Sequence, residues 1–490
     1  MSTESVAAPA APQARHLRLP GGRRAWSVVL MLLGFLIINF ADKAVLGLAA
    51  SPLREELGLT ASQYGTASGA FFLLFSVTAV VGGLLADRVP AKWLLLGMAL
   101  LWSVTQLPVV LFASFGGLLA SRLALGMAEG PTLPVVTHAL YKWFPADRRS
   151  LPTVVVVLGG PLGVVLAAPL VSKVISESGW RAAFVTVALA SVVWAGGWLL
   201  VGREAPDVPA DEVAVPVATA PLTKEGSQAV PDSGSAEREA EGGDTADDKD
   251  AAAGAASGAP TVGYLRVLRS RSWLAAAAAA IAVYWAGAQL VAWLPQYLEV
   301  AQGYSPERAR SLAALPWAVQ MAVLLVPGLL APRLIRKGHL MGTVNASLAA
   351  GTAALAAIAL LTLPVLPDGL PRLVAVTVGM GLPILIMPLM LTAIGAVIPV
   401  NLRGGVLGVL AGVYSTAATL SPVVTGHLID SASTEKAGYT QAFTVAGVLL
   451  LVAAVAVAFL LRPERDARML REALPMVSEP VPVSVPATAG

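Results

Sequence analysis

Cysteine is absent from the 490-residue chain, so the sequence offers no disulfide framework, no thiolate metal site and no thiol nucleophile. Charged residues are also scarce: they make up 13% of the chain, about half the share in a soluble globular domain. No metal-ligand cluster, nucleotide-binding loop or nucleophile–base motif is found. These absences argue against a secreted scaffold, a nucleic-acid-binding protein and a soluble enzyme, and we expect no cofactor.

The chain has instead long apolar runs, and 56% of its residues are hydrophobic. Runs of about 20 residues are long enough to cross a bilayer as helices. The first run carries Asp42 and Lys43 and lacks a small-residue cleavage site, which predicts a retained span rather than a signal peptide. The sequence therefore predicts an all-α polytopic membrane protein with twelve transmembrane helices, at residues 26–50, 62–86, 93–114, 117–141, 151–175, 182–202, 273–297, 310–334, 340–364, 372–398, 405–429 and 440–461.

Basic residues cluster between alternate runs, while those on the opposite side are largely matched by neighbouring acids, and the positive-inside rule assigns the basic clusters to the cytoplasmic side. Both chain termini are therefore predicted to be cytoplasmic. A composition rich in Ala, Val and Arg suggests a bacterial cell membrane, and we expect a monomer. The basic residues on this side include Arg15, Arg18, Arg23, Arg24, Arg88, Lys92, Lys142, Arg148, Arg149, Arg333, Arg336, Lys337, Arg403, Arg462, Arg465 and Arg468.

Residues 204–262 interrupt the apolar pattern with Ala, Gly, Ser, Pro, Asp and Glu, a composition that cannot bury enough surface to order the chain. We interpret this stretch as a tether, with a regulatory docking segment as the alternative. The predicted domains are a cytoplasmic tail at 1–24, a six-helix bundle at 25–203, a disordered acidic linker at 204–268, a second six-helix bundle at 269–463 and a disordered tail at 464–490.

The two halves repeat short motifs in the same order, offset by about 245 to 254 residues. A Gly-Leu-Leu-Ala run at 83–86 returns at 328–331, Phe144-Pro145 returns as Ile398-Pro399, and a Pro-Leu-Val-Ser run at 169–172 returns as Pro-Val-Val-Thr at 422–425. Such duplication is typical of secondary transporters built from two bundles.

These motifs resemble the major facilitator superfamily. The run from Gly83 through Asp87 and Arg88 to Lys92 resembles the cytoplasmic loop signature of that superfamily, although Pro90 and Ala91 replace its usual Gly and Arg. The resemblance implies a gating role for the loop, by pairing across the cytoplasmic helix ends. The predicted gating residues are Gly83, Asp87, Arg88, Lys92 and Arg333.

Other stretches resemble the anion:cation symporter family of organic-anion transporters. They include Asn-Phe-Ala-Asp-Lys at 39–43, Arg122 with Glu-Gly-Pro at 129–131, Gly-Trp-Arg at 179–181 and Trp-Leu-Pro at 293–295. In this sequence Lys43 stands where the family has an arginine associated with the anionic substrate. Phe75 and Ala79 replace a common Tyr and Gln, which makes a sugar acid a poorer expected substrate than a more apolar carboxylate.

Four ionisable residues lie inside predicted spans, where charges are expensive and mark functional sites. Arg122 and Glu129 are seven residues apart and share a helix face. Asp42 and Arg122 are predicted about 9 and 8 Å below the same boundary, with Lys43 and Glu129 bordering the cavity. We expect Glu129 and Asp42 to couple protons and Lys43, Arg122 and Asn39 to bind substrate. The alternative is that these charges form structural pairs.

The second half is expected to supply aromatic and polar substrate contacts, from Tyr284, Trp285, Gln289, Tyr414 and Ser415. Two carboxylates and two cations leave the empty site neutral, so a bound monoanion favours uptake of one proton. The sequence thus predicts proton symport of a small organic anion by alternating access, with the bilayer as the only other partner. A drug or metabolite antiporter is the runner-up, although a Gly-Pro-x-x-Gly-Gly signature fails at Val164 and Val165, and a transporter-like sensor is a distant third.

Overall fold

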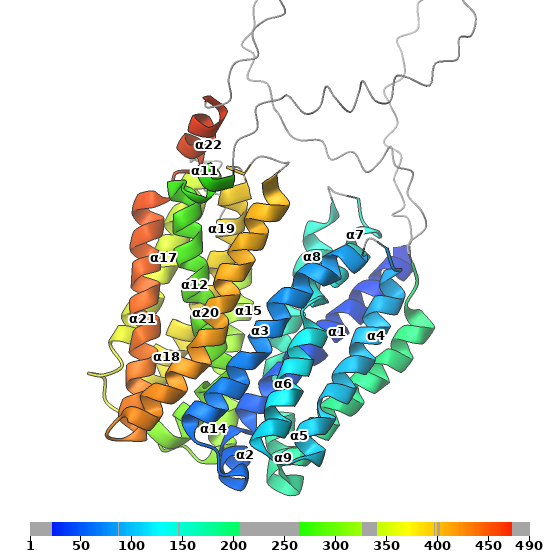
Figure 1. Ribbon diagram of the computed structural model, residues 1–490, viewed down its shortest axis with the longest axis vertical. Helices are drawn as coiled ribbons and strands as arrows, with labels where there is room; N and C mark the ends of the chain where they lie inside the picture. The colour runs from blue at the N-terminus through cyan, green and yellow to red at the C-terminus, as the bar shows by residue number, and fades with distance from the viewer. Residues whose placement is uncertain are drawn as a thin grey trace, which may run out of the picture.

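The computed structural model describes residues 22–86, 88–145, 148–204, 264–325, 341–395, 397–398 and 402–472. These residues form helices and their connections, arranged as two bundles side by side (Figure 1). Helix lies on each of the twelve expected ranges, and eight helical segments are long and apolar enough to span a membrane by themselves. The predicted all-α polytopic class is confirmed. Most of the expected linker, at 205–263, lies outside the described residues.

The first bundle runs from α1 to α9. Its helices are α1 (Gly22–Leu48), α2 (Ala50–Leu57), α3 (Ala61–Ala86), α4 (Ala91–Thr105), α5 (Leu107–Leu111), α6 (Phe115–Glu129), α7 (Thr132–Tyr141), α8 (Ser150–Val157) and α9 (Gly159–Val201). Within α9, Gly179 has φ +81°, a left-handed value that glycine adopts without strain, and two helices join there. One long element thus accounts for parts of two expected spans.

The second bundle runs from α11 to α22. Its elements are α11 (Tyr264–Leu268), α12 (Arg271–Ala292), α13 (Leu294–Gln296), the π-helix η3 (Tyr297–Ala301), α14 (Pro306–Leu312), α15 (Leu315–Leu324), α17 (Met341–Leu361), α18 (Leu370–Gly381), the 3₁₀ helix η4 (Leu382–Leu385), α19 (Ile386–Gly395), α20 (Arg403–Ser431), α21 (Glu435–Leu460) and α22 (Pro463–Glu472).

Two boundaries differ from the sequence prediction. Residues expected to be a disordered tail form α22, in which Asp466 is buried and accepts a hydrogen bond from the backbone N–H of Ser272 at 2.8 Å. A carboxylate at the start of α12 satisfies a free backbone donor and the helix dipole. Likewise α11 lies in the range assigned to the linker. The polar α22 is therefore held to the bundle by its cap on α12, and α11 by its buried Val267.

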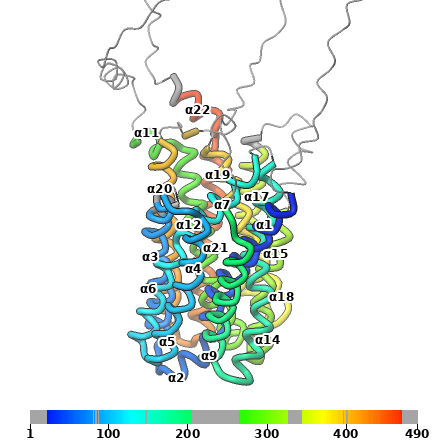
Figure 2. Tube along the Cα trace, turned by 90° about the vertical axis from the view of Figure 1, so that its right-hand side faces the viewer, coloured from blue at the N-terminus to red at the C-terminus, as the bar shows by residue number. Residues whose placement is uncertain are grey.

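The helices run between two ends of the molecule, a terminal end and a distal end. The terminal end carries the start of α1 and α22, and the distal end carries α2, α5 and α14, as the perpendicular view also shows (Figures 1 and 2). Large apolar side chains point outward from the helices, among them Leu73, Val193, Leu200, Ile358 and Phe459, which are 54–81% exposed. An apolar exterior of this extent suits lipid and not water.

The two bundles meet along α3 and α20, which lie side by side (Figure 1). Glycine permits the approach: a Cβ on Gly65 would overlap the carbonyl oxygen of Pro422, and one on Gly69 would overlap that of Thr419. Small residues at helix crossings let backbones pack closely in membranes. This seam positions the site, since the α1 and α12 residues beside it face each other across the halves.

Candidate functional site

Four charged side chains gather inside the first bundle, as the helix arithmetic predicts. Asp42 and Lys43 come from α1, and Arg122 and Glu129 from α6. Glu129, Asp42 and Arg122 are at most 2% exposed, and the Lys43 side chain is 14% exposed. Burial of this kind requires that charges be paired and hydrogen-bonded.

Lys43 and Glu129 form the first pair. The Lys43 Nζ atom lies 2.7 Å from Glu129 Oε2 and also donates to the side-chain oxygen of Asn39. Three phenylalanine rings surround the ammonium, with centroids 4.8 Å (Phe40), 5.9 Å (Phe71) and 5.6 Å (Phe75) from Nζ. Aromatic faces stabilise a cation without occupying its N–H donors.

Asp42 and Arg122 are joined through Gln106, which sequence reasoning missed. The Gln106 amide N–H donates to Asp42 Oδ1, and Arg122 Nη2 donates to Gln106 Oε1 at 2.6 Å. The signal was an amide in an apolar run two residues before Pro108, at the junction of α4 and α5. Asp42 Oδ2 and Arg122 Nε make no hydrogen bond within the described part of the chain.

Glu129 sits at a break in its helix. It ends α6, and α7 starts at Thr132 after Gly130 and Pro131. Proline has no N–H to continue the ladder and breaks or kinks a helix. A Cβ on Gly130 would overlap the carbonyl oxygen of Phe75 and the hydroxyl of Thr78, so the break is packed against α3. The buried carboxylate therefore lies beside a point where the hydrogen-bond ladder of the helix is interrupted.

A cavity opens beside these charges, between the two halves. It has about 360 Å³ of empty space, its open mouth included. α12 of the second bundle forms its opposite wall. Its lining residues are Lys43, Leu46, Gly47, Ser68, Phe71, Phe72, Arg122, Ala288, Val291 and Ala292. Both cations of the cluster reach the cavity, and neither carboxylate does.

The predicted contacts from the second half lie on α12 and α20 but do not line this cavity. Tyr284 stacks on Tyr414 with ring centroids 3.9 Å apart. Gln289 is buried and donates to Thr425 and to the Ala442 carbonyl. The Trp285 carbonyl accepts from Ser421, and Ser415 is buried, its carbonyl accepting from Thr419. In this conformation these residues join helices of the second bundle.

The predicted gating residues are only partly described. Asp87 and Arg333 lie outside the described residues, Gly83 is in the last turn of α3, and Arg88 is exposed. The Lys92 backbone N–H donates to Glu204 Oε1 at 2.8 Å, and Lys92 Nζ donates to the Leu199 carbonyl at 3.4 Å. These Lys92 contacts stay within the first bundle and tie α4 to the end of α9.

Polar contacts between the halves gather at the distal end. Asp430 accepts hydrogen bonds from the backbone N–H groups of Ala61 (3.0 Å) and Ser62 (2.8 Å), the first residues of α3, and from the Ser62 hydroxyl. Arg310 donates from Nε to the Leu48 carbonyl at the end of α1, at 2.9 Å. The first half thus supplies two helix ends, the start of α3 and the end of α1, and the second half caps each with a charge that suits the helix dipole.

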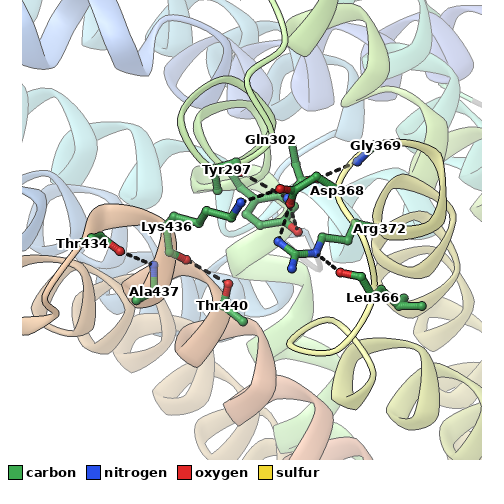
Figure 3. A network of polar contacts seen from close by, with 11 residues as sticks. Tyr297, Gln302, Leu366, Asp368, Gly369, Arg372, Thr434, Lys436, Ala437 and Thr440 are labelled. Atoms are coloured by element: carbon green, nitrogen blue, oxygen red, sulfur yellow. Dashed lines mark hydrogen bonds and ion pairs between the residues drawn. The ribbon is translucent and has the colours of Figure 1, made fainter.

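Further distal contacts reinforce this closure. Ser51 donates to Glu299 at 2.8 Å, and Tyr64 donates to the Ala292 carbonyl at 3.0 Å. Beside them, Figure 3 shows Asp368 held between Lys436 and Arg372, all within the second bundle. The hydrogen bond from Lys436, 2.7 Å long, keeps the pKa of Asp368 below its ordinary value. This inner network orients the loop before α18 without crossing the halves.

Comparison with known proteins places this geometry in a family. The family model described as Major Facilitator Superfamily matches residues 31–385. A hexuronate transporter of Bacillus subtilis is 25% identical over 445 residues, covering 89% of this chain and 94% of that protein. A probable sulfoacetate transporter of Cupriavidus necator is 25% identical over 460 residues, covering 91% and 98%.

Solved structures agree in fold. A bacterial homolog of the human lysosomal transporter Spinster, described as inward-facing and unoccupied, matches with a TM-score of 0.64 at 17% identity, over 91% of this chain and 98% of that one. A D-xylose-proton symporter matches with a TM-score of 0.67 at 12% identity, over 90% and 99%. The two-bundle architecture is therefore shared well beyond recognisable sequence similarity.

Proposed function

This chain belongs to the major facilitator superfamily, and from that premise we propose that it carries a small organic anion across the cell membrane together with a proton. The observation that carries the proposal is the pairing of Lys43 with Glu129 at the edge of a cavity between the halves. The names of the relatives, which include hexuronate, sulfoacetate and galacturonate transporters, support an organic acid as the cargo.

The charges of the site favour anion binding. Of the charged cluster, only the cations line the cavity, and Lys43 has one N–H beyond those directed at Glu129 and Asn39. Lys43 is the counter-charge of Glu129, so an anionic head group that binds Lys43 competes with Glu129 for it. A buried carboxylate without its cation favours the neutral form, so anion binding and protonation of Glu129 assist each other.

In this proposal the cycle is alternating access. The distal closure separates the cavity from one side of the membrane, and rocking of the two bundles about the α3–α20 seam exposes it to the other. The terminal end, with its basic residues, faces the cytoplasm. In the conformation described, Arg310 and Asp430 of the second bundle cap the end of α1 and the start of α3, and these contacts hold the distal side shut.

The closure yields a prediction about conformation. We expect Asp430→Ala to shift the protein toward a state that is open at the distal end, by on the order of tenfold, because α3 loses a charged cap and its hydrogen bonds. The chain has no cysteine, so spin labels at Glu55→Cys and Glu307→Cys, both exposed distal sites on different halves, report the distance directly. A longer-distance population is expected to grow.

The matched control is Asp368→Ala. It removes the same charge from the same end, yet Asp368 pairs with Lys436 and Arg372 inside one bundle (Figure 3). Its distance distribution is expected to match that of the parent. An equal shift in both variants would mean that distal charge, and not the cap across the halves, sets the equilibrium.

The proposed function is tested by uptake into proteoliposomes. Radiolabelled glucuronate and benzenesulfonate are supplied outside, with and without an imposed acid-outside pH gradient. We expect the gradient to drive accumulation of at least one of them above the level in protein-free vesicles. Uptake of neither anion, or uptake that ignores the gradient, would refute proton symport.

A further inference from the structure

The cavity divides into a charged floor and an apolar wall, and this division bears on the kind of anion it accepts. At the floor, Lys43 and Arg122 supply the charge, and Arg122 Nε has no hydrogen-bond acceptor within the described residues. Arg122 is 2% exposed, so this unused donor is buried. A carboxylate or sulfonate head group carries the charge and the acceptor oxygens that such cations bind.

The remaining wall has almost nothing to offer a hydroxyl group. It comprises Leu46, Gly47, Phe71 and Phe72 from the first half and Ala288, Val291 and Ala292 from α12. Ser68 is the single side-chain hydroxyl among the lining residues, and it already donates to the Tyr64 carbonyl at 2.9 Å. The rings of Phe40, Phe71 and Phe75 around Lys43 also carry no polar atom.

We infer that the site selects a small monoanion with an apolar body, bearing a carboxylate or sulfonate head, and rejects polyhydroxylated sugar acids. The inference rests on the proposed function and goes beyond it by naming the substrate class. A sugar acid brings several hydroxyls that lose water on entry and find no partner here. Each unpaired hydroxyl weakens binding on the order of tenfold.

An aromatic or alicyclic body has no hydroxyl groups that would need partners in the cavity. Its burial against Phe72, Val291 and Leu46 removes apolar surface from water and leaves no polar group unpaired. The selection thus differs from that named for the hexuronate transporters among the relatives.

The test compares probes on the purified full-length chain. Benzenesulfonate and cyclohexanecarboxylate are titrated against glucuronate and galacturonate by calorimetry. We expect the apolar anions to bind at least about tenfold more tightly. Equal or tighter binding of the sugar acids would overturn the inference, and pH-driven uptake of glucuronate alone would do so while leaving the proposed function intact. Binding and uptake of neither class would overturn both.

A wall variant locates the selectivity. Val291→Thr places a hydroxyl on the cavity wall at constant shape, and is expected to raise the affinity for glucuronate relative to benzenesulfonate by about threefold to tenfold. Val283→Thr is the control, because Val283 is a valine two turns earlier on α12 that does not line the cavity. An unchanged ratio in Val291→Thr, or the same change in Val283→Thr, would contradict the assignment of the wall.

Discussion

Replacement of Glu129 by glutamine is expected to reduce pH-driven uptake of the anion at least about tenfold, while exchange of internal for external anion persists. Glutamine keeps the size and the hydrogen-bonding capacity of the side chain but can neither release nor accept the coupled proton. Because the neutral amide also frees Lys43, anion binding is retained. The measurement is a pair of assays on one proteoliposome preparation: accumulation under an acid-outside gradient, and counterflow without one.

Asp42→Asn is the matched control for this prediction. Asp42 is tied to Arg122 through Gln106, whereas Glu129 pairs directly with the cavity-lining Lys43. We expect its replacement to weaken accumulation and counterflow together, because Arg122 loses its charged anchor. Should Asp42→Asn uncouple transport while Glu129→Gln does not, Asp42 would be the proton site.

Replacement of Lys43 by methionine is expected to lower anion affinity on the order of a hundredfold, because the cavity loses the cation that meets the head group. It also strands the buried Glu129 carboxylate, at 0% exposure, without a counter-charge. Breaking one partner of a buried pair typically costs about 3–5 kcal/mol of stability. Binding titrations and thermal unfolding of the detergent-solubilised chain measure the two effects separately.

The double variant Lys43→Met with Glu129→Gln separates binding from folding. Removing both charges is expected to recover most of the lost stability, since no uncompensated charge remains, while anion binding stays lost. Lys43→Arg keeps the charge and is expected to keep binding. If the double variant recovered both stability and binding, Lys43 would be a purely structural partner of Glu129.

Much of this architecture follows from the sequence because the bilayer restricts the choices. Long apolar runs in a chain with few charges permit helices and little else, and the spacing of Arg122 and Glu129 is enough to place both on one face. Charges inside spans are rare, so Asp42, Lys43, Arg122 and Glu129 are recognisable from the sequence alone.

The contacts that could not be predicted from the sequence depend on tertiary packing. Gln106 bridges two charges only because the α4–α5 junction lies against α1 and α6, and a single glutamine in an apolar run does not reveal which side chains it will contact. Asp430 caps α3 through Ala61 and Ser62, which lie 369 and 368 positions away from it in the sequence. Tyr284 and Tyr414 were expected to face a ligand, whereas here they stack on each other. Side-chain partners across helices do not follow from helical periodicity.

The central claim is that anion binding and protonation of Glu129 are linked, and proton uptake on binding tests it most directly. Purified protein in weakly buffered solution with a pH indicator is titrated with whichever of benzenesulfonate or glucuronate binds; both are fully ionised near neutral pH. We predict that about one proton enters the protein for each anion bound, and that Glu129→Gln binds the anion without a change in pH. Binding to the parent protein with no proton uptake would contradict the account.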